Sequence, residues 1–189
     1  PSQGRISVNG APPHRGRGPV GVGAMIETPS LYPNLTAHEN LAVTQLTLGQ
    51  KSVDFPALLR KVGLREVDGK RIAAFSLGMK QRLAIALALL AEPRILILDE
   101  PVNGLDPEGI DEVRNLLTHL SRDQGITVFL SSHILSDVER VATHVGILRE
   151  GRIAFEGALA DTHAGWKGVT PARSTGLLIS GTPLPGGGN

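Results

Sequence analysis

The chain has 189 residues, of which 41% are hydrophobic and 20% are charged, with a formal net charge of +1. This length and composition suit one compact domain with a sizeable core and argue against wholesale disorder. Cysteine is absent, which excludes disulfides, thiolate metal sites and a cysteine nucleophile. Balanced charge and 3% aromatic residues argue against a polyanion-binding surface, so we expect no nucleic-acid partner.

The first part of the chain reads as loop followed by helices. Residues 5–8 predict a short strand, and the Gly- and Pro-rich stretch after it predicts a loop. Thr36 and Glu39 have the spacing of a capping box and predict the start of a helix. Residues 53–62 predict a second helix, and the Ala- and Leu-rich residues 79–91 predict the clearest one.

Strands and helices then alternate along the chain. The predicted elements are a strand at 95–98, a helix at 110–120, a strand at 126–130, a short helix at 136–142 and a hairpin of 145–148 with 152–155. This alternation predicts a parallel sheet covered by helices, with an antiparallel hairpin late in the chain. The periodicity disappears from about residue 162, which predicts a flexible tail.

The strongest chemical signal is ILILDEP, residues 95–101. Its aliphatic run predicts a strand buried on both faces. Asp99 and Glu100 are not needed for packing, and at the carboxyl edge of a parallel sheet they would point into the usual ligand crevice. Asp99 can hold Mg²⁺ there, and Glu100 can polarise an attacking water. The alternative is a pair of solvated acids before a proline turn.

Three weaker signals accompany this strand. Ser76 and Gly78 begin the Ala- and Leu-rich helix, where backbone N–H groups suit a phosphate, although an ordinary helix cap is the simpler reading. Asp106 follows Asn103-Gly104-Leu105 and reads by default as a turn or cap residue. His133 follows a strand and can contact a phosphate or a water, although a lone histidine there is more often structural.

In this order, FSLGMKQR, ILILDEP, NGLDP and SSHIL resemble the second half of an ABC-type ATPase, the nucleotide-binding subunit of ATP-driven transporters. FSLGM resembles the signature sequence, ILILDE the Walker B strand, NGLD the D-loop, and His133 the switch histidine. The resemblance covers residues 1–160, with about 34–92 as a helical subdomain and 161–189 as a flexible or atypical tail. The stretch VGAMIETPSLYPNLTAHENL is similar to bacterial exporters of antibiotics and peptides.

The resemblance implies an α/β fold, a P-loop NTPase-like parallel sheet with flanking helices and a helical subdomain. It also implies ATP and Mg²⁺ as cofactors. Asp99 would hold the metal, Glu100 and His133 would act in hydrolysis, and Glu27 would orient metal or water.

The same resemblance implies that two nucleotide-binding domains pair head to tail around two ATP molecules, as a homodimer or heterodimer. Ser76 and Gly78 would then contact a nucleotide held by the partner, and Asp106 of the D-loop would belong to the nucleotide-binding residues. Transmembrane permease subunits would bind around residues 27–39, which implies a cytoplasmic subunit, peripheral on the inner face of the cell membrane.

Three departures from the family pattern matter. The Walker A loop, G-x-x-x-x-G-K-[ST], is absent, so we expect the chain to begin after this loop and to be inactive alone. We also expect an inner strand of the sheet to be missing, which leaves its neighbours with unpaired backbone groups and the fold marginal unless a partner fills the gap. Glu27 stands where most relatives have Gln. FSLGM departs from the commoner LSGGQ but keeps Ser76 and Gly78.

Two functions remain open. The first is an ATP-hydrolysing subunit that powers membrane transport, with export suggested by the exporter-like stretch. The alternative is a non-enzymatic degenerate fragment, or a regulatory half-site that donates its signature residues to an intact partner. The ATPase head of a DNA-repair or chromosome-structure protein is disfavoured, because the sequence has no heptad run.

Overall fold

The computed structural model describes residues 3–8, 10–12, 21–27, 30–49, 52–133, 140–161 and 175–180. Its elements in chain order are β1 (Val22–Met25), α1 (Ala37–Leu48), α2 (Phe55–Lys61), α3 (Leu77–Leu89), β2 (Ile95–Leu98), α4 (Pro107–Arg122), β3 (Thr127–Ser132), β4 (His144–Arg149), β5 (Arg152–Ala158) and β6 (Thr175–Ser180). Two short 3₁₀ helices, Ile72–Ala74 and Leu159–Asp161, complete them. The predicted α/β class is confirmed.

The strands form one six-stranded sheet in the order β1-β2-β3-β6-β4-β5. β1, β2 and β3 run parallel, and Val22, Ile95 and Thr127 lie side by side at their first positions. The predicted hairpin is confirmed by the antiparallel pairing of β4 and β5. Because β1, β2 and β3 share one direction, the residues that follow them gather at one edge of the sheet.

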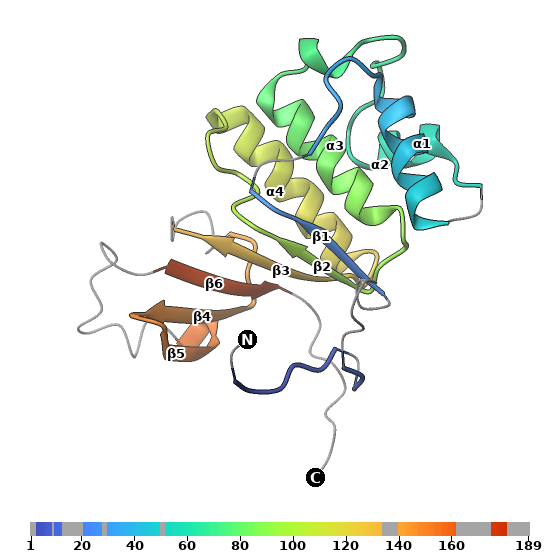
Figure 1. Cartoon of the computed structure of the whole chain (residues 1–189). Coiled ribbons are helices and arrows are strands. Elements are labelled where there is room, and N and C mark those ends of the chain that lie inside the picture. The colour runs from blue at the N-terminus through green and yellow to red at the C-terminus, as the bar shows by residue number, and fades with distance from the viewer. Residues whose placement is uncertain are drawn as a thin grey trace.

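The helices lie on one side of the sheet (Figure 1). In β2, Leu96 and Leu98 point into the core, whereas Ile97 is 38% exposed. The prediction of a strand buried on both faces is therefore wrong. In the part of the chain that the structure describes, helices cover only the face of the sheet that holds Leu96 and Leu98. Ile97 is as apolar as its neighbours, so the residue types of this strand do not reveal that its opposite face is exposed.

The helix starts follow from local capping. The capping box of α1 is confirmed: Thr36 Oγ1 accepts a hydrogen bond from the Glu39 N–H, and the Glu39 carboxylate accepts one from the Thr36 N–H. Asp54 caps α2 and Pro56 lies in its first turn. Ser76 caps α3, whose middle is buried among the other helices and β1.

Three predicted segments differ from the structure or fall outside it. Residues 5–8 form no strand, and Val8 makes only an isolated bridge to Ala11. Most of the short helix expected at 136–142 lies outside the described residues. The predicted tail, 161–189, contains β6, which the sequence analysis does not anticipate; residues 162–174 and 181–189 are not among those described.

Candidate functional site

Three strands of the sheet end at one edge, and polar side chains follow each of them. Glu27 comes after β1, Asp99 and Glu100 come directly after β2, and His133 comes directly after β3. The Asp99 N–H donates to the carbonyl of Met25 over 2.9 Å, which fixes the end of β2 against β1. We call Glu27, Asp99, Glu100, Ser131 and His133 the acidic edge.

Glu100 has a strained backbone. Its φ of 47° lies in the left-handed region, which costs a residue with a Cβ roughly 1–2 kcal/mol. The turn at Glu100 ends the extended path of β2, and its side chain, which is 17% exposed, lies against His133. Glu92 and Glu150 have similar φ values of 47° and 51°, so the left-handed turn shapes the end of β2 and does not by itself mark a functional site.

The hydroxyl of Ser131 holds the two acids together. Ser131 Oγ donates to Asp99 Oδ1 over 2.6 Å and accepts from the backbone N–H of Glu100 over 2.9 Å. The sequence analysis missed Ser131. The available signal was its place in a strand that neighbours the acid-bearing strand, two residues before His133, where a hydroxyl can reach across the sheet edge.

Glu100 and His133 form a direct pair. His133 Nδ1 lies 3.0 Å from Glu100 Oε2, and the histidine side chain is 54% exposed. The second carboxylate oxygen of Glu100 is not used by this contact and can accept a hydrogen bond from a water. The pair can therefore orient and polarise a water molecule while His133 stays open to a ligand in solvent.

Glu27 is tied to the loop after β2 and not to the other acids. Asn103 Nδ2 donates to Glu27 Oε1 over 3.2 Å, across 76 positions of sequence. Asn103 is a second residue that the sequence analysis missed as a contact, because its partner lies on another strand. The bond connects Glu27, two residues after β1, to the loop that begins at Glu100 and ends at Asp106.

Ser76, Gly78 and Asp106 gather at a separate place. They line a cavity of about 490 Å³, here called the signature cavity, between the start of α3 and the start of α4. Ser76 Oγ accepts from the Met79 N–H over 3.2 Å, and Asp106 Oδ1 accepts from the Gly109 N–H over 3.0 Å. Both residues are therefore helix caps, as the simpler readings predict, and both face the same cavity.

Arg82 connects the elements around the signature cavity. Its guanidinium donates to the Gly63 carbonyl over 3.2 Å and lies 3.2 Å from the Glu112 carboxylate. Its Nε also donates to the Gly78 carbonyl over 3.4 Å. The Arg82 side chain, only 13% exposed, thus fixes the first turn of α3 relative to α2 and α4.

The donors of the acidic edge suit a hard cation. Mg²⁺ usually takes one or two carboxylates and completes its shell with water and phosphate oxygens, and Asp99 with the Ser131 hydroxyl supplies oxygens of this kind. No group of three His, Cys, Asp or Glu side chains that could hold a metal occurs within the described ranges. The printed sequence contains no G-x-x-x-x-G-K-[ST] loop to surround the phosphates.

A comparison with protein families shows which family the chain belongs to. The family model described as ABC transporter matches residues 1–103, more than half of the chain. The chain belongs to the ABC transporter family.

Curated relatives agree with this family. The chain is 46% identical over 143 residues to the bacitracin transport ATP-binding protein BcrA of Enterococcus faecalis, covering 75% of this chain and 46% of that one. It is 47% identical over 135 residues to the lantibiotic transport ATP-binding protein SrtF of Streptococcus pyogenes, covering 71% and 58%. The chain thus spans about half the length of the curated ABC transporter relatives it matches.

A solved ABC transporter ATP-binding subunit has the same fold. It matches with a TM-score of 0.73 at 33% identity, over 90% of this chain and 74% of that one. The expected P-loop NTPase-like sheet with flanking helices is therefore confirmed as that of an ABC ATP-binding domain. Among the described helices, none combines the length and apolar character required to cross a bilayer.

Proposed function

We propose that this chain provides the Walker B, switch, D-loop and signature parts of an ATP-binding subunit that powers export through an ABC transporter. The observation that carries the proposal is the contact of Glu100 with His133, 3.0 Å apart, beside an aspartate held by Ser131. Family membership supports ATP with Mg²⁺ as the ligand.

In the proposed reaction, the chain's residues orient a water for attack on the terminal phosphate. Asp99 would hold Mg²⁺, which would supply positive charge against the phosphate oxygens. Glu100 accepts a hydrogen bond from the water at the carboxylate oxygen that His133 does not use. It takes the proton of the water as the water oxygen bonds to the terminal phosphorus, while the bond from that phosphorus to the bridging oxygen breaks and ADP leaves. His133 holds Glu100 Oε2 in place, and Glu27 would orient metal or water.

Ser76 and Gly78 act on a different nucleotide in this proposal. They line the signature cavity with Asp106, and no hydrogen bond or ion pair described for the chain links them to Asp99, Glu100 or His133. A Ser-capped helix start with a Gly in its first turn presents N–H groups to a phosphate. We infer that a second nucleotide-binding domain, in a homodimer or heterodimer, brings its nucleotide to this cavity.

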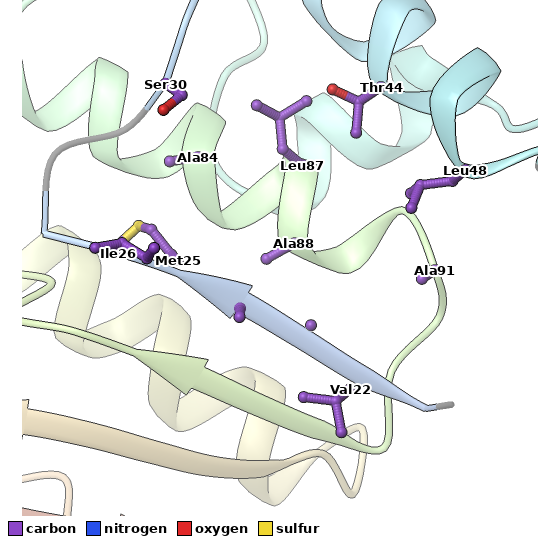
Figure 2. Close-up of a pocket in the computed structure, with 12 residues that line it drawn as sticks. Val22, Met25, Ile26, Ser30, Thr44, Leu48, Ala84, Leu87, Ala88 and Ala91 are labelled. Atoms are coloured by element: carbon purple, nitrogen blue, oxygen red, sulfur yellow. The ribbon is translucent and has the colours of Figure 1, made fainter. Parts of the chain in front are cut away.

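An apolar groove offers a docking place for the permease subunits. A cavity of about 370 Å³ lies between β1, α1 and α3, and Figure 2 shows Met25, Ile26, Thr44 and Leu87 around it. Ile26 is 75% exposed at its rim. Ile26 directly precedes Glu27, which belongs to the acidic edge. A permease helix seated in this groove would therefore lie against a residue next to the acidic edge. This proposal places the subunit peripherally on the inner face of the membrane.

The proposed cargo is a peptide antibiotic. It rests on the two relatives named for bacitracin and lantibiotic transport, each at least 46% identical over the matched residues. In this proposal the permease subunits recognise the cargo.

A second candidate function is a half-site that donates the signature cavity to an intact partner. The observation that favours it is the signature cavity itself, which Ser76, Gly78 and Asp106 line apart from the acidic edge. A form of the chain without a phosphate loop would lack about three charge-assisted phosphate contacts of roughly 1.5–3 kcal/mol each, which would reduce ATP affinity at least ~10³-fold.

One extended chain separates the two functions. A segment that carries the loop G-x-x-x-x-G-K-[ST] is placed before Pro1, and phosphate release is measured with Mg²⁺ and ATP. We expect turnover that Glu100→Gln abolishes, and none from the unextended chain. Turnover by the unextended chain that Glu100→Gln abolishes would contradict our account of the missing loop. An extended chain that folds and binds ATP without turnover would favour the half-site.

A further inference from the structure

We propose that Asn103 is a positioning residue that links Glu27 of the acidic edge to the signature cavity. The inference rests on the proposed function and deepens it, because Glu27 has a role in hydrolysis only under that proposal. The physical link from Glu27 through Asn103 to the cavity does not depend on ATP chemistry, so it can be tested without a nucleotide.

The acids of the acidic edge are held by side chains from other parts of the chain. Asp99 and Glu100 are held from β3 and from the residue after it. Glu27 is held from the loop after β2, since Asn103 Nδ2 donates to Glu27 Oε1 over 3.2 Å. This bond uses one carboxylate oxygen of Glu27, and the other oxygen can face a ligand. The direction of that second oxygen therefore depends on where Asn103 lies.

Asn103 stands between the acidic edge and the signature cavity within one short loop. On one side of it, the Asn103 N–H donates to the Glu100 carbonyl over 3.1 Å. On the other side, Gly104 and Leu105 line the signature cavity, and the Leu105 N–H donates to the Val102 carbonyl over 3.3 Å. The Val102 side chain is buried, so the loop has a fixed position from which Asn103 meets the segment after β1.

The cavity side of this loop is closely packed. Gly104 has a φ of 74°, and a Cβ at this position would lie 3.2 Å from Leu77 Cδ2 at the start of α3. A ligand that enters the signature cavity therefore meets Gly104, and Asn103 is the next residue along the backbone. A shift of Gly104 changes the hydrogen bond at Glu27 through this chain of contacts. The influence is reciprocal, so a change at Glu27 also alters the loop that lines the cavity.

Hydrogen exchange of the full chain tests this link. Glu27→Ala removes the acceptor from a position outside both the loop and the cavity, so we expect the amides of residues 101–109 to exchange on the order of fivefold faster. Ile26→Ala is the matched control, because it changes the neighbouring position, where the side chain is 75% exposed. It should leave the exchange of residues 101–109 within about twofold of the unmodified chain. Unchanged exchange in Glu27→Ala, or an equal increase in both variants, would overturn the link.

Interchange of donor and acceptor tests the contact itself. Asn103→Asp places a second carboxylate against Glu27, and the repulsion should speed exchange of residues 101–109. When Glu27→Gln is added, the amide introduced at position 27 can donate to the carboxylate introduced at position 103. Exchange in this double variant should return to within about twofold of the unmodified chain. An increase that Glu27→Gln does not reverse would show that the two side chains do not act through each other.

Turnover separates the positioning role from the proposed function. In the extended chain that carries the phosphate loop, Asn103→Asp should lower kcat about fivefold and leave KM within about twofold, because it displaces Glu27 and not the phosphate contacts. Added to Glu27→Gln, the same substitution should lower kcat by less than about twofold. Equal losses in the two backgrounds would overturn the positioning role. An extended chain without any turnover would contradict the proposed function, and the exchange measurements would still decide the link between Glu27 and the cavity.

Discussion

Ser131 and Asp99 lie 32 positions apart in the chain and share a hydrogen bond of 2.6 Å. The same hydroxyl accepts the N–H of Glu100, so one uncharged side chain joins the ends of β2 and β3 at the acidic edge. The orientation of both acids therefore depends on a residue that is itself unable to act as acid or base at neutral pH.

Replacement of Ser131 tests this relationship. Ser131→Ala removes the donor to Asp99 and leaves the Glu100 N–H without its partner, so we expect the free energy of unfolding to fall by about 1–3 kcal/mol. Ser131→Thr keeps the hydroxyl on a strand and should cost less. Urea denaturation of both variants measures the difference; equal losses for Ala and Thr would show that the hydroxyl does not hold the edge together.

Replacement by alanine should change the stability of the chain in opposite directions at Gly23 and Gly78. A Cβ at Gly23 would lie 2.2 Å from the carbonyl oxygen of Ala88 in α3, so Gly23→Ala should destabilise the chain by about 1–3 kcal/mol. A Cβ at Gly78 would meet nothing closer than 3.8 Å, so Gly78→Ala should stabilise α3 by about 0.5–1 kcal/mol. Thermal melts of the two variants distinguish these signs, and destabilisation by Gly78→Ala would contradict the open signature cavity.

The capping box of α1 predicts a pH dependence. Hydrogen bonds from Thr36 hold the pKa of Glu39 below its ordinary value of 4.5. Because the folded-state pKa is lowered, the stabilisation is complete above the unfolded pKa and is lost as pH falls through the folded pKa. The free energy of unfolding is measured from pH 7 to pH 3 for the unmodified chain and for Glu39→Gln. The unmodified chain should be more stable by an amount that is constant near neutrality and that decreases below about pH 4.5. An advantage that does not change with pH would contradict this cause.

Arg82 should matter more than an exposed arginine. Arg82→Met removes its contacts to the Gly63 carbonyl and to Glu112 and should cost about 1–3 kcal/mol. The matched control is Arg140→Met, since Arg140 is 72% exposed and lies 3.8 Å from Asp111; it should change stability by less than about 0.5 kcal/mol. Similar losses at the two positions would mean that Arg82 does not connect α3 to its neighbours.

Local signals explain which parts of the fold could be predicted. The Thr36 and Glu39 capping box, the Ser76 cap and the aliphatic run of β2 are determined by neighbouring residues, and each is confirmed. The exposure of Ile97 depends on what covers the sheet, which an aliphatic run does not reveal. The position of β6 depends on pairing with strands far away in sequence, and its short apolar segment has no alternation to mark it.

The site residues likewise include some that a sequence motif predicts and others that only the fold brings together. Motif order alone suggests that Glu100 and His133 belong together, and the structure brings them within 3.0 Å. Ser131 and Asn103 could not be assigned, because their hydrogen bonds cross between strand ends and a serine or asparagine near a turn has many ordinary explanations.

The central claim is that the acidic edge and the signature cavity serve different nucleotides, and mixing two inactive variants of the extended chain tests it most directly. Glu100→Gln disables the acidic edge. Gly78→Asp places a carboxylate in the signature cavity, where it repels phosphate but suits the first turn of α3. We predict that each variant alone lacks turnover and that a mixture recovers a substantial fraction of it, because one mixed site combines an intact edge with an intact cavity. No recovery from mixed dimers that form normally would contradict the claim.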